Sequence, residues 1–230
     1  MGNRPSPLRK AIRWTEVDKV KKILDHAGGD AARLINEDHT PDCIMESCSR
    51  SIGNAFYYAV RWNRVEIVGI LLDYGGDPYS TGAYGETCMH LAARNNYVEI
   101  GRILISCGFD VRVTDDNGRH PIHSASSSIF DTSGFVRFIL EQAKDVDYVN
   151  VRDFYGRTPL HTAASVNNTE VAQTLLDRGA MVNVLDKNGN SPLHEARRRP
   201  AMWQLLVEHG ADVDAKNNDD LTAEQMARSG

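Results

Sequence analysis

Four histidines are the first residues of this chain that could do chemistry. They are His90, His123, His161 and His194, and in three of them a Thr or Ser stands three residues earlier, as in "TPLH". A His beside a hydroxyl could be half of a nucleophilic site, in which the imidazole takes the hydroxyl proton. A catalytic His is needed once, however, whereas these recur at spacings of 33, 38 and 33 residues. The recurrence predicts a structural role instead.

A second group of residues could bind a metal ion. His39, Cys43 and Cys48 lie in the segment 28–54, together with Asp38, Asp42 and Glu46. Zinc sites usually show closely paired ligands such as C-x2-C, and here a fourth ligand is not evident. We therefore interpret the segment as a polar loop that helps to contact a partner, and we expect no metal and no cofactor.

No catalytic motif stands out elsewhere. The stretch "DTSG" at 131–134 matches the nucleophile motif of aspartic proteases, but it has no second copy in the chain. Phosphate loops, nucleophile elbows and metalloprotease helices are absent from the sequence. We expect a protein that is not an enzyme.

Composition narrows the class of protein further. The 230 residues are 41% hydrophobic and 25% charged, with a net charge of −5, which is typical of a folded domain and argues against general nucleic-acid binding. No apolar run could cross a bilayer, and no signal peptide is evident. Four scattered cysteines suggest a reducing compartment, so we expect the cytoplasm or the nucleus. "MGNRPS" matches an acylation pattern at Gly2, but Pro5 and Pro7 flank its Ser, and Pro7 suits the helix start of the first repeat.

The histidines belong to a repeated unit. "TPLH" at 158–161 returns as "SPLH" at 191–194, and "LLDRGA" at 175–180 matches "LLDYGG" at 71–76. Thr158 is a suitable N-cap, Pro159 suits the first helical position, and Gly179 suits the end of a second helix. Each unit therefore predicts a turn, a short helix, a turn and a longer helix, and such units bury their apolar faces by stacking.

This unit resembles the ankyrin repeat, and the resemblance covers almost the whole chain. It implies an all-α solenoid of stacked helix-turn-helix units with short β-turn fingers. Arg9 and Tyr57 stand where the family has His. We expect a single domain over 1–230, an inserted loop at 30–51, and repeats near 5–29, 52–77, 85–110, 118–148, 156–181, 189–212 and, in part, 219–230.

The resemblance also implies where partners bind. In this family the turn tips and the exposed side of the short helix form a concave binding face. Aromatic and arginine residues, which are enriched at interface hot spots, gather at the corresponding positions here. The predicted partner-binding residues are Arg61, Trp62, Tyr84, Glu86, Arg94, Asn95, Asn117, Arg119, Phe154, Tyr155, Arg157, Lys187, Asn188 and Arg198.

The sequence thus predicts a monomeric protein-interaction module whose partner carries acidic and apolar groups, with no nucleic acid and no membrane insertion. Two alternatives stay open: a substrate adaptor of a ubiquitin ligase, and a regulatory domain of a larger enzyme or channel. We expect Tyr155→Ala or Arg157→Ala to weaken binding at least about tenfold without lowering the melting temperature.

Overall fold

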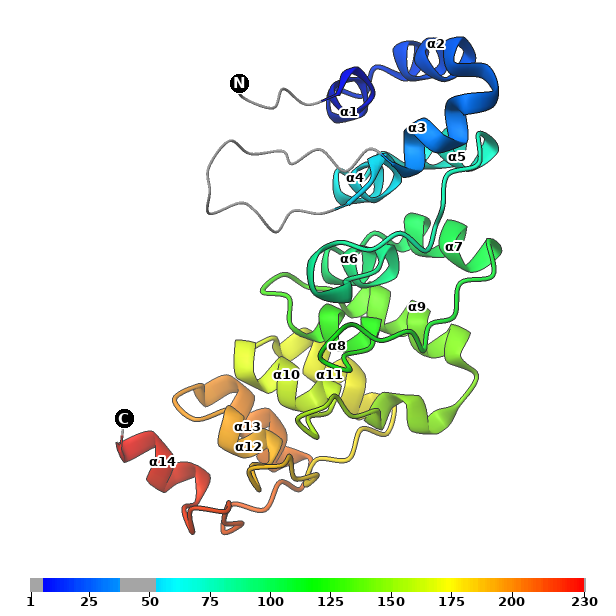
Figure 1. Ribbon diagram of the computed structural model, residues 1–230. Helices are drawn as coiled ribbons and strands as arrows, with labels where there is room; N and C mark the ends of the chain where they lie inside the picture. The colour runs from blue at the N-terminus through cyan, green and yellow to red at the C-terminus, as the bar shows by residue number, and fades with distance from the viewer. Residues whose placement is uncertain (1–5, 38–52, 230) are drawn as a thin grey trace. The chain divides into compact units, whose positions relative to one another are not determined.

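The computed structural model describes residues 6–37 and 53–229, and in these residues the structure is helical with short turns (Figure 1). Two compact units divide the chain. Unit 1 comprises the residues up to Ala92 together with Glu99–Asp110, and unit 2 comprises Ala93–Val98 and the residues from Val111 onward. His39, Cys43 and Cys48, which the sequence did not favour as metal ligands, and the acylation candidate Gly2 lie outside the described residues.

Unit 1 consists of short helices that alternate with longer ones. Its elements are α1 (Pro7–Arg13), α2 (Val17–Ala27), the 3-10 helix η1 (Gly28–Asp30), α3 (Ala31–Asn36), α4 (Ala55–Arg61), α5 (Val65–Asp73), the 3-10 helix η3 (Ala83–Gly85), and most of α6 (Cys88–Arg94) and α7 (Val98–Ser106).

Helix α3 changes the expectation for the segment 30–51, because the first part of this predicted loop is helical. α3 packs against α2 and α4, and it buries Ala31 and Ile35. Asn36 fixes its end: its side-chain amide donates to the carbonyl of Gly75 at 3.0 Å and accepts from the backbone N–H of Asp77 at 2.9 Å. Residues 31–36 are therefore part of the packed structure of unit 1.

Unit 2 repeats the same pairing of helices. Its elements are α8 (Pro121–Ser126), α9 (Ser133–Ala143), the 3-10 helix η4 (Val146–Asn150), α10 (Pro159–Val166), α11 (Thr169–Asp177), α12 (Pro192–Glu195), α13 (Pro200–Glu208) and α14 (Ala223–Ser229). Where repeat four lacks the usual glycine, Lys144 ends α9 in the left-handed conformation at φ 53°. α13 begins at Pro200, because proline suits the first helical position.

The short helices begin as the sequence predicts. In α10, the Thr158 side chain accepts from the backbone of His161, and the His161 side chain accepts from the backbone N–H of Thr158 at 3.1 Å. This reciprocal cap satisfies two N–H groups that the first helical turn leaves without partners. Ser191 and His194 form the same cap at α12.

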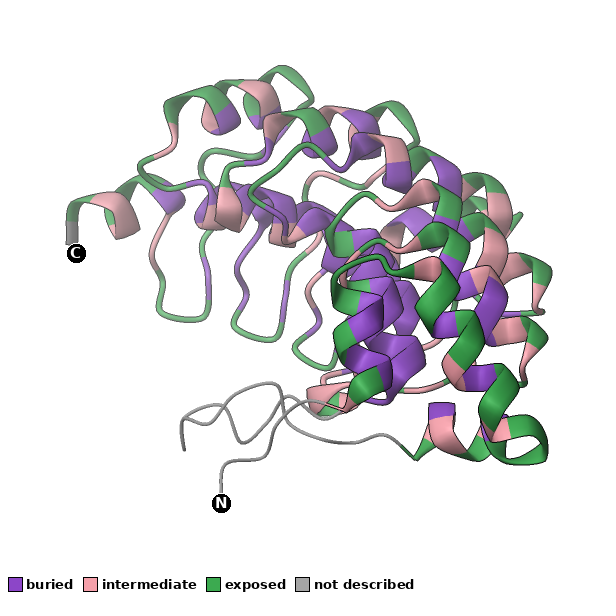
Figure 2. Cartoon of the chain, turned by 90° about the horizontal axis from the view of Figure 1, so that it is seen from above, coloured by how far each residue is buried: buried purple, intermediate pink, exposed green. Residues whose placement is uncertain are grey.

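The core of each unit lies between the helices (Figure 2). In the pair α10–α11, Leu160, Ala163, Ala164, Val171 and Leu175 are fully buried. The two alanines carry little side-chain volume, which lets the helices of neighbouring repeats approach closely, as α10 and α12 do. The sequence prediction of a repeated pair of a short and a longer helix is confirmed.

Candidate protein-binding surface

Both ring nitrogens of His123, His161 and His194 form hydrogen bonds with the backbone. Nδ1 of His161 accepts from the N–H of Thr158, so the imidazole proton is on Nε2, which donates to the carbonyl of Asn190 at 3.0 Å. His123 and His194 make the same contact with the carbonyls of Arg157 and Leu221, both at 3.1 Å. Each of these histidines joins its own helix start to the turn of the next repeat.

Burial keeps the rings of His123 and His161 neutral. Desolvation lowers the pKa of His161, and it lowers the pKa of His123 to about 4, although the carbonyls that accept from Nε2 oppose the shift. A neutral ring with both nitrogens in hydrogen bonds has no free position for proton transfer with a substrate. This geometry fits the structural role that the sequence predicts for the histidines.

Tyr57 occupies the histidine position of repeat two and makes a variant of this contact. Its hydroxyl donates to the Glu86 carboxylate at 2.6 Å, and Glu86 directly precedes the next helix cap. Burial and the neighbouring Glu86 charge both raise the pKa of Tyr57. Glu86, a predicted partner-binding residue, therefore holds two repeats together.

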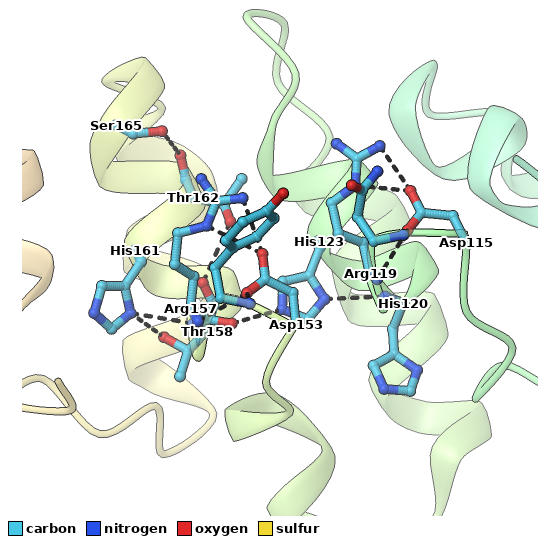
Figure 3. A network of polar contacts seen from close by, with 12 residues as sticks. Asp115, Arg119, His120, His123, Asp153, Arg157, Thr158, His161, Thr162 and Ser165 are labelled. Carbon is cyan, nitrogen blue, oxygen red and sulfur yellow. Dashed lines mark hydrogen bonds and ion pairs between the residues drawn. The ribbon is translucent and has the colours of Figure 1, made fainter. Parts of the chain in front are cut away.

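Three finger turns of unit 2 are built around a buried aspartate, Asp115, Asp153 or Asp186, and Figure 3 shows the first two. Oδ1 of Asp153 accepts from the backbone N–H groups of Tyr155 and Arg157, both at 2.9 Å. Its Oδ2 accepts from the Arg157 guanidinium at 2.9 and 3.0 Å. The turn is thus fixed by its own first residue.

The same arrangement recurs in the neighbouring fingers. Asp115 pairs with Arg119 at 2.7 Å, and Oδ1 of Asp186 accepts from the N–H groups of Asn188 and Asn190. Burial alone would raise the pKa of Asp115, but hydrogen bonds from the Arg119 side chain and from backbone N–H groups outweigh it and lower the pKa. The sequence signal is an Asp four residues before the Arg, as in "DDNGR", a spacing that the sequence predictions did not include.

These pairs change the electrostatics of the predicted surface. Arg119 and Arg157 are half-buried, and each lies against a carboxylate that is almost fully buried. Their positive charge is therefore largely neutralised within the protein. The basic character that the sequence predicts for this face is weaker than a count of arginines indicates.

Backbone hydrogen bonds link neighbouring fingers at their tips. The N–H of Phe154 donates to the carbonyl of Asn117 at 3.0 Å, and the N–H of Lys187 donates to the carbonyl of Tyr155 at 2.9 Å. The next finger continues the series from Asn218 to Asn188 at 3.0 Å. The side chains on the tips therefore project from a fixed backbone.

Two large aromatic side chains are exposed on these tips. Phe154 is 62% exposed and lies over Gly118, where a Cβ would come within 2.3 Å of the Phe154 ring. Tyr155 is 54% exposed, and the Arg157 guanidinium lies 5.1 Å from its ring centroid. With the polar tips they form what we call the finger surface: Asn117, Arg119, Phe154, Tyr155, Arg157, Lys187 and Asn188.

The other predicted residues lie elsewhere. In unit 1, Arg61 is exposed at the end of α4, Trp62 follows it with its ring 5.3 Å from that of Tyr58, and Tyr84 is exposed in η3 at φ 59°. In unit 2, Arg94 and Asn95 are exposed at and after the end of α6. Arg198 follows α12, at the opposite end of that helix from its finger.

Stacked helix pairs joined through finger turns define a helical repeat protein. The family model described as "Ankyrin repeats (3 copies)" matches residues 56–153 and 132–217. The chain belongs to the ankyrin repeat family, whose repeats are protein–protein interaction modules.

Similar proteins agree with this assignment. The crystal structure of the ankyrin repeat domain of Bcl-3, a member of the IkappaB protein family, matches with a TM-score of 0.72 at 26% identity, over 97% of this chain and 94% of that chain. The B-cell lymphoma 3 protein homolog of Mus musculus is 31% identical over 71% of this chain, and the palmitoyltransferase AKR1 of Lachancea kluyveri is 33% identical over 93%.

The matched region is a small part of the curated relatives. It spans 37% of the B-cell lymphoma 3 protein homolog, 28% of AKR1 and 6% of the neurogenic locus notch homolog protein 1 of Xenopus laevis, which is 32% identical over 146 residues. Among the described residues no helix is both long and apolar enough to cross a membrane.

Proposed function

We propose that this chain is a non-enzymatic interaction module that binds a protein partner at the finger surface, with Phe154 and Tyr155 as its anchors. The observation that carries the proposal is the exposure of these two rings on a backbone fixed by hydrogen bonds to both neighbouring fingers. Large aromatic side chains dominate binding energy at interfaces, and a preorganised surface loses little entropy on binding.

The partner's chemistry follows from what surrounds the rings. Lys187 and Asn188 are exposed on the next finger tip, and Lys187 carries a positive charge that no ion pair among the described residues neutralises. An apolar group would cover Phe154 and Tyr155, while an acidic or carbonyl group would meet Lys187. Apolar contact is the larger contribution, because the Arg119 and Arg157 charges are already paired.

The test is an affinity measurement on matched variants. A partner would be isolated with the parent chain and then titrated against Phe154→Ser, Tyr155→Ser and the control Val146→Ser, whose side chain is 87% exposed but lies outside the finger surface. We expect each finger variant to weaken binding at least about tenfold, and the control to bind like the parent. Equal affinities for all three variants would show that the partner binds elsewhere.

A further inference from the structure

The turn between α12 and α13 consists of three consecutive arginines, Arg197, Arg198 and Arg199, after Ala196. Arg198 is left-handed, at φ 64°. In three equivalent turns between short and long helices asparagine takes this conformation, at Asn63, Asn96 and Asn167, and in the first such turn Thr15 takes it. Asparagine tolerates left-handed dihedrals, whereas a long side chain with an ordinary Cβ is strained there. Strained residues of this kind are concentrated at functional sites.

Main-chain carbonyls hold the three guanidinium groups in place. Arg197 donates to the carbonyl of His194 at 3.4 Å, Arg199 to that of Glu195 at 2.8 Å, and Arg198 to that of Ala227 in α14 at 3.1 Å. Unlike Arg119 and Arg157, none of the three forms an ion pair with a carboxylate of the described chain. Their positive charge is therefore available to a ligand.

Two open pockets meet at these arginines. The first, of about 490 Å³, is lined by Ser165, Glu195 and the three arginines. The second, of about 570 Å³, shares Arg198 and Arg199 and is otherwise mainly apolar, with walls from Pro200, Trp203, Val213 and Ala227 and one charged residue, Glu224. Glu224 is itself paired with Arg228 at 2.6 Å. A positive pocket thus adjoins an apolar one.

We propose that this arginine turn, Arg197–Arg199 with the two pockets, binds an acidic segment of a protein partner. Carboxylates of the segment pair with the guanidinium groups, which present planar donors suited to bidentate contact. A large apolar side chain of the same segment enters the second pocket beside Trp203 and Val213. The arginine turn lies beyond the opposite end of α12 from the finger surface, so this site is additional to the proposed function.

The apolar pocket decides between an acidic protein segment and a nucleic acid. A phosphate backbone would satisfy the arginines, but it offers no aliphatic or aromatic side chain to the wall formed by Pro200, Val213 and Ala227. The net charge of −5 also opposes association with a polyanion over a larger area. The observations therefore favour a short acidic segment with an apolar residue.

The experiment uses defined probes. A fluorescein-labelled synthetic peptide of glutamates around one phenylalanine is titrated against the full chain by anisotropy. Companion probes replace the phenylalanine by glycine or the glutamates by glutamines, and a labelled single-stranded oligonucleotide reports nucleic-acid binding. We expect the parent peptide to bind, both altered peptides to bind at least about tenfold more weakly, and the oligonucleotide to bind more weakly than the peptide.

Matched variants locate the binding. The double variant Arg197→Gln/Arg199→Gln leaves the contact of Arg198 with α14 in place. It should lower the affinity for the phenylalanine peptide at least about tenfold. Val213→Ser should lower the affinity for the phenylalanine peptide but not the affinity for the glycine peptide. Arg178→Gln, an exposed arginine on another turn, and Tyr155→Ser should leave peptide binding unchanged. Thermal melting confirms that each variant is folded.

Any of three results would overturn the inference. The first is an equal loss of peptide affinity in Arg178→Gln and in the double variant. The others are tighter binding of the oligonucleotide than of the peptide, and no binding of the peptide to the parent chain. Loss of peptide binding in Tyr155→Ser would place the acidic ligand on the finger surface instead. Because Tyr155 belongs only to the finger surface, failure of the arginine turn and failure of the proposed function give different patterns.

Discussion

Arg9 donates from Nη2 to the carbonyl oxygen of Gly53 at 2.7 Å, in the position where His161 donates from Nε2 to Asn190. The Arg9 side chain is fully buried, and its guanidinium carbon lies 3.6 Å from the ring centroid of Tyr58. Gly53 directly precedes the cap Asn54, just as Asn190 precedes the cap Ser191. An arginine thus makes the inter-repeat contact that histidine makes elsewhere.

Replacing Arg9 should therefore destabilise unit 1. Arg9→Leu removes the donor to Gly53 and the stacking on Tyr58, and we expect a loss of about 2–4 kcal/mol in the free energy of unfolding. Urea denaturation, monitored by circular dichroism, measures this free energy. Arg9→His should retain part of the contact and lose less. An effect of Arg9→Leu no larger than that of the exposed-site variant Arg33→Leu would contradict this interpretation.

Acid should destabilise the repeats through the buried histidines His123 and His161, whose pKa values are lowered. The pKa of His123 is about 4 in the folded chain, against 6.5 for an ordinary histidine, so the unfolded chain binds the proton more readily. The stabilisation is complete above about pH 6.5 and is lost as the pH falls toward 4, by on the order of 3 kcal/mol for this residue.

Thermal melting between about pH 7.5 and pH 4 checks this prediction, because this range spans the ordinary histidine pKa and the lowered pKa of His123. The variant His123→Gln should be less stable at neutral pH and should show a shallower dependence on pH. His209→Gln, at an exposed histidine, is the matched control for replacing a histidine by glutamine. A parent slope retained in full by His123→Gln would assign the acid sensitivity to other groups.

Arg157 and Tyr155 should separate stability from binding. Arg157→Ala leaves the buried Asp153 carboxylate without its cation, and we expect a loss of about 1–2 kcal/mol, limited by the partial exposure of Arg157. Tyr155→Ala should change stability by no more than about 0.5 kcal/mol. For Arg157→Ala we therefore now expect a lower melting temperature, in place of the unchanged one expected from the sequence.

Chemical denaturation of the two variants, with Asp153→Asn as a third, tests the pairing. Asp153→Asn keeps the size of the side chain but weakens both the ion pair and the acceptance of backbone N–H groups, so it should cost at least as much as Arg157→Ala. If Arg157→Ala melted like the parent, the pair with Asp153 would contribute nothing to the fold.

Two glycines offer a controlled test of the finger contacts. Gly179 and Gly189 have φ of 87° and 75°, so alanine is strained at both by about 1 kcal/mol. A Cβ at Gly179 would meet nothing within 4 Å, whereas at Gly189 it would lie 2.8 Å from the backbone nitrogen of Asn218. Gly189→Ala should therefore cost at least about 1 kcal/mol more than Gly179→Ala in urea denaturation. Equal losses of unfolding free energy in the two variants would show that the last finger moves away from the new Cβ without a measurable cost.

The repeat pattern predicted most of the fold because each unit carries its own local signals. Thr158, Pro159 and Gly179 mark helix ends wherever the unit recurs, and the structure confirms these positions. Helix α3 could not be predicted in this way, since Ala31 and Ile35 lie in a segment without a counterpart in the other repeats. Its helical form depends on packing against α2 and α4.

The candidate site was less predictable for a related reason. Sequence position placed Arg119, Phe154 and Arg157 on finger turns, but the neutralisation of the arginines depends on how each turn folds around Asp115 or Asp153. The pockets at Arg197–Arg199 require knowledge of α14, whose Ala227 accepts from Arg198. Contacts between residues far apart in the sequence decide both features.

The contact that four repeats make with the carbonyl of the residue before the next cap has a consequence for protein engineering. It spans 44 residues from Arg9 to Gly53, 34 from His123 to Arg157, 29 from His161 to Asn190 and 27 from His194 to Leu221, with donor–acceptor distances between 2.7 and 3.1 Å. The stacking geometry is therefore independent of how much chain lies between the two ends. A foreign peptide or reporter domain grafted between them, at a turn remote from both ends, should leave the spacing of the repeats unchanged.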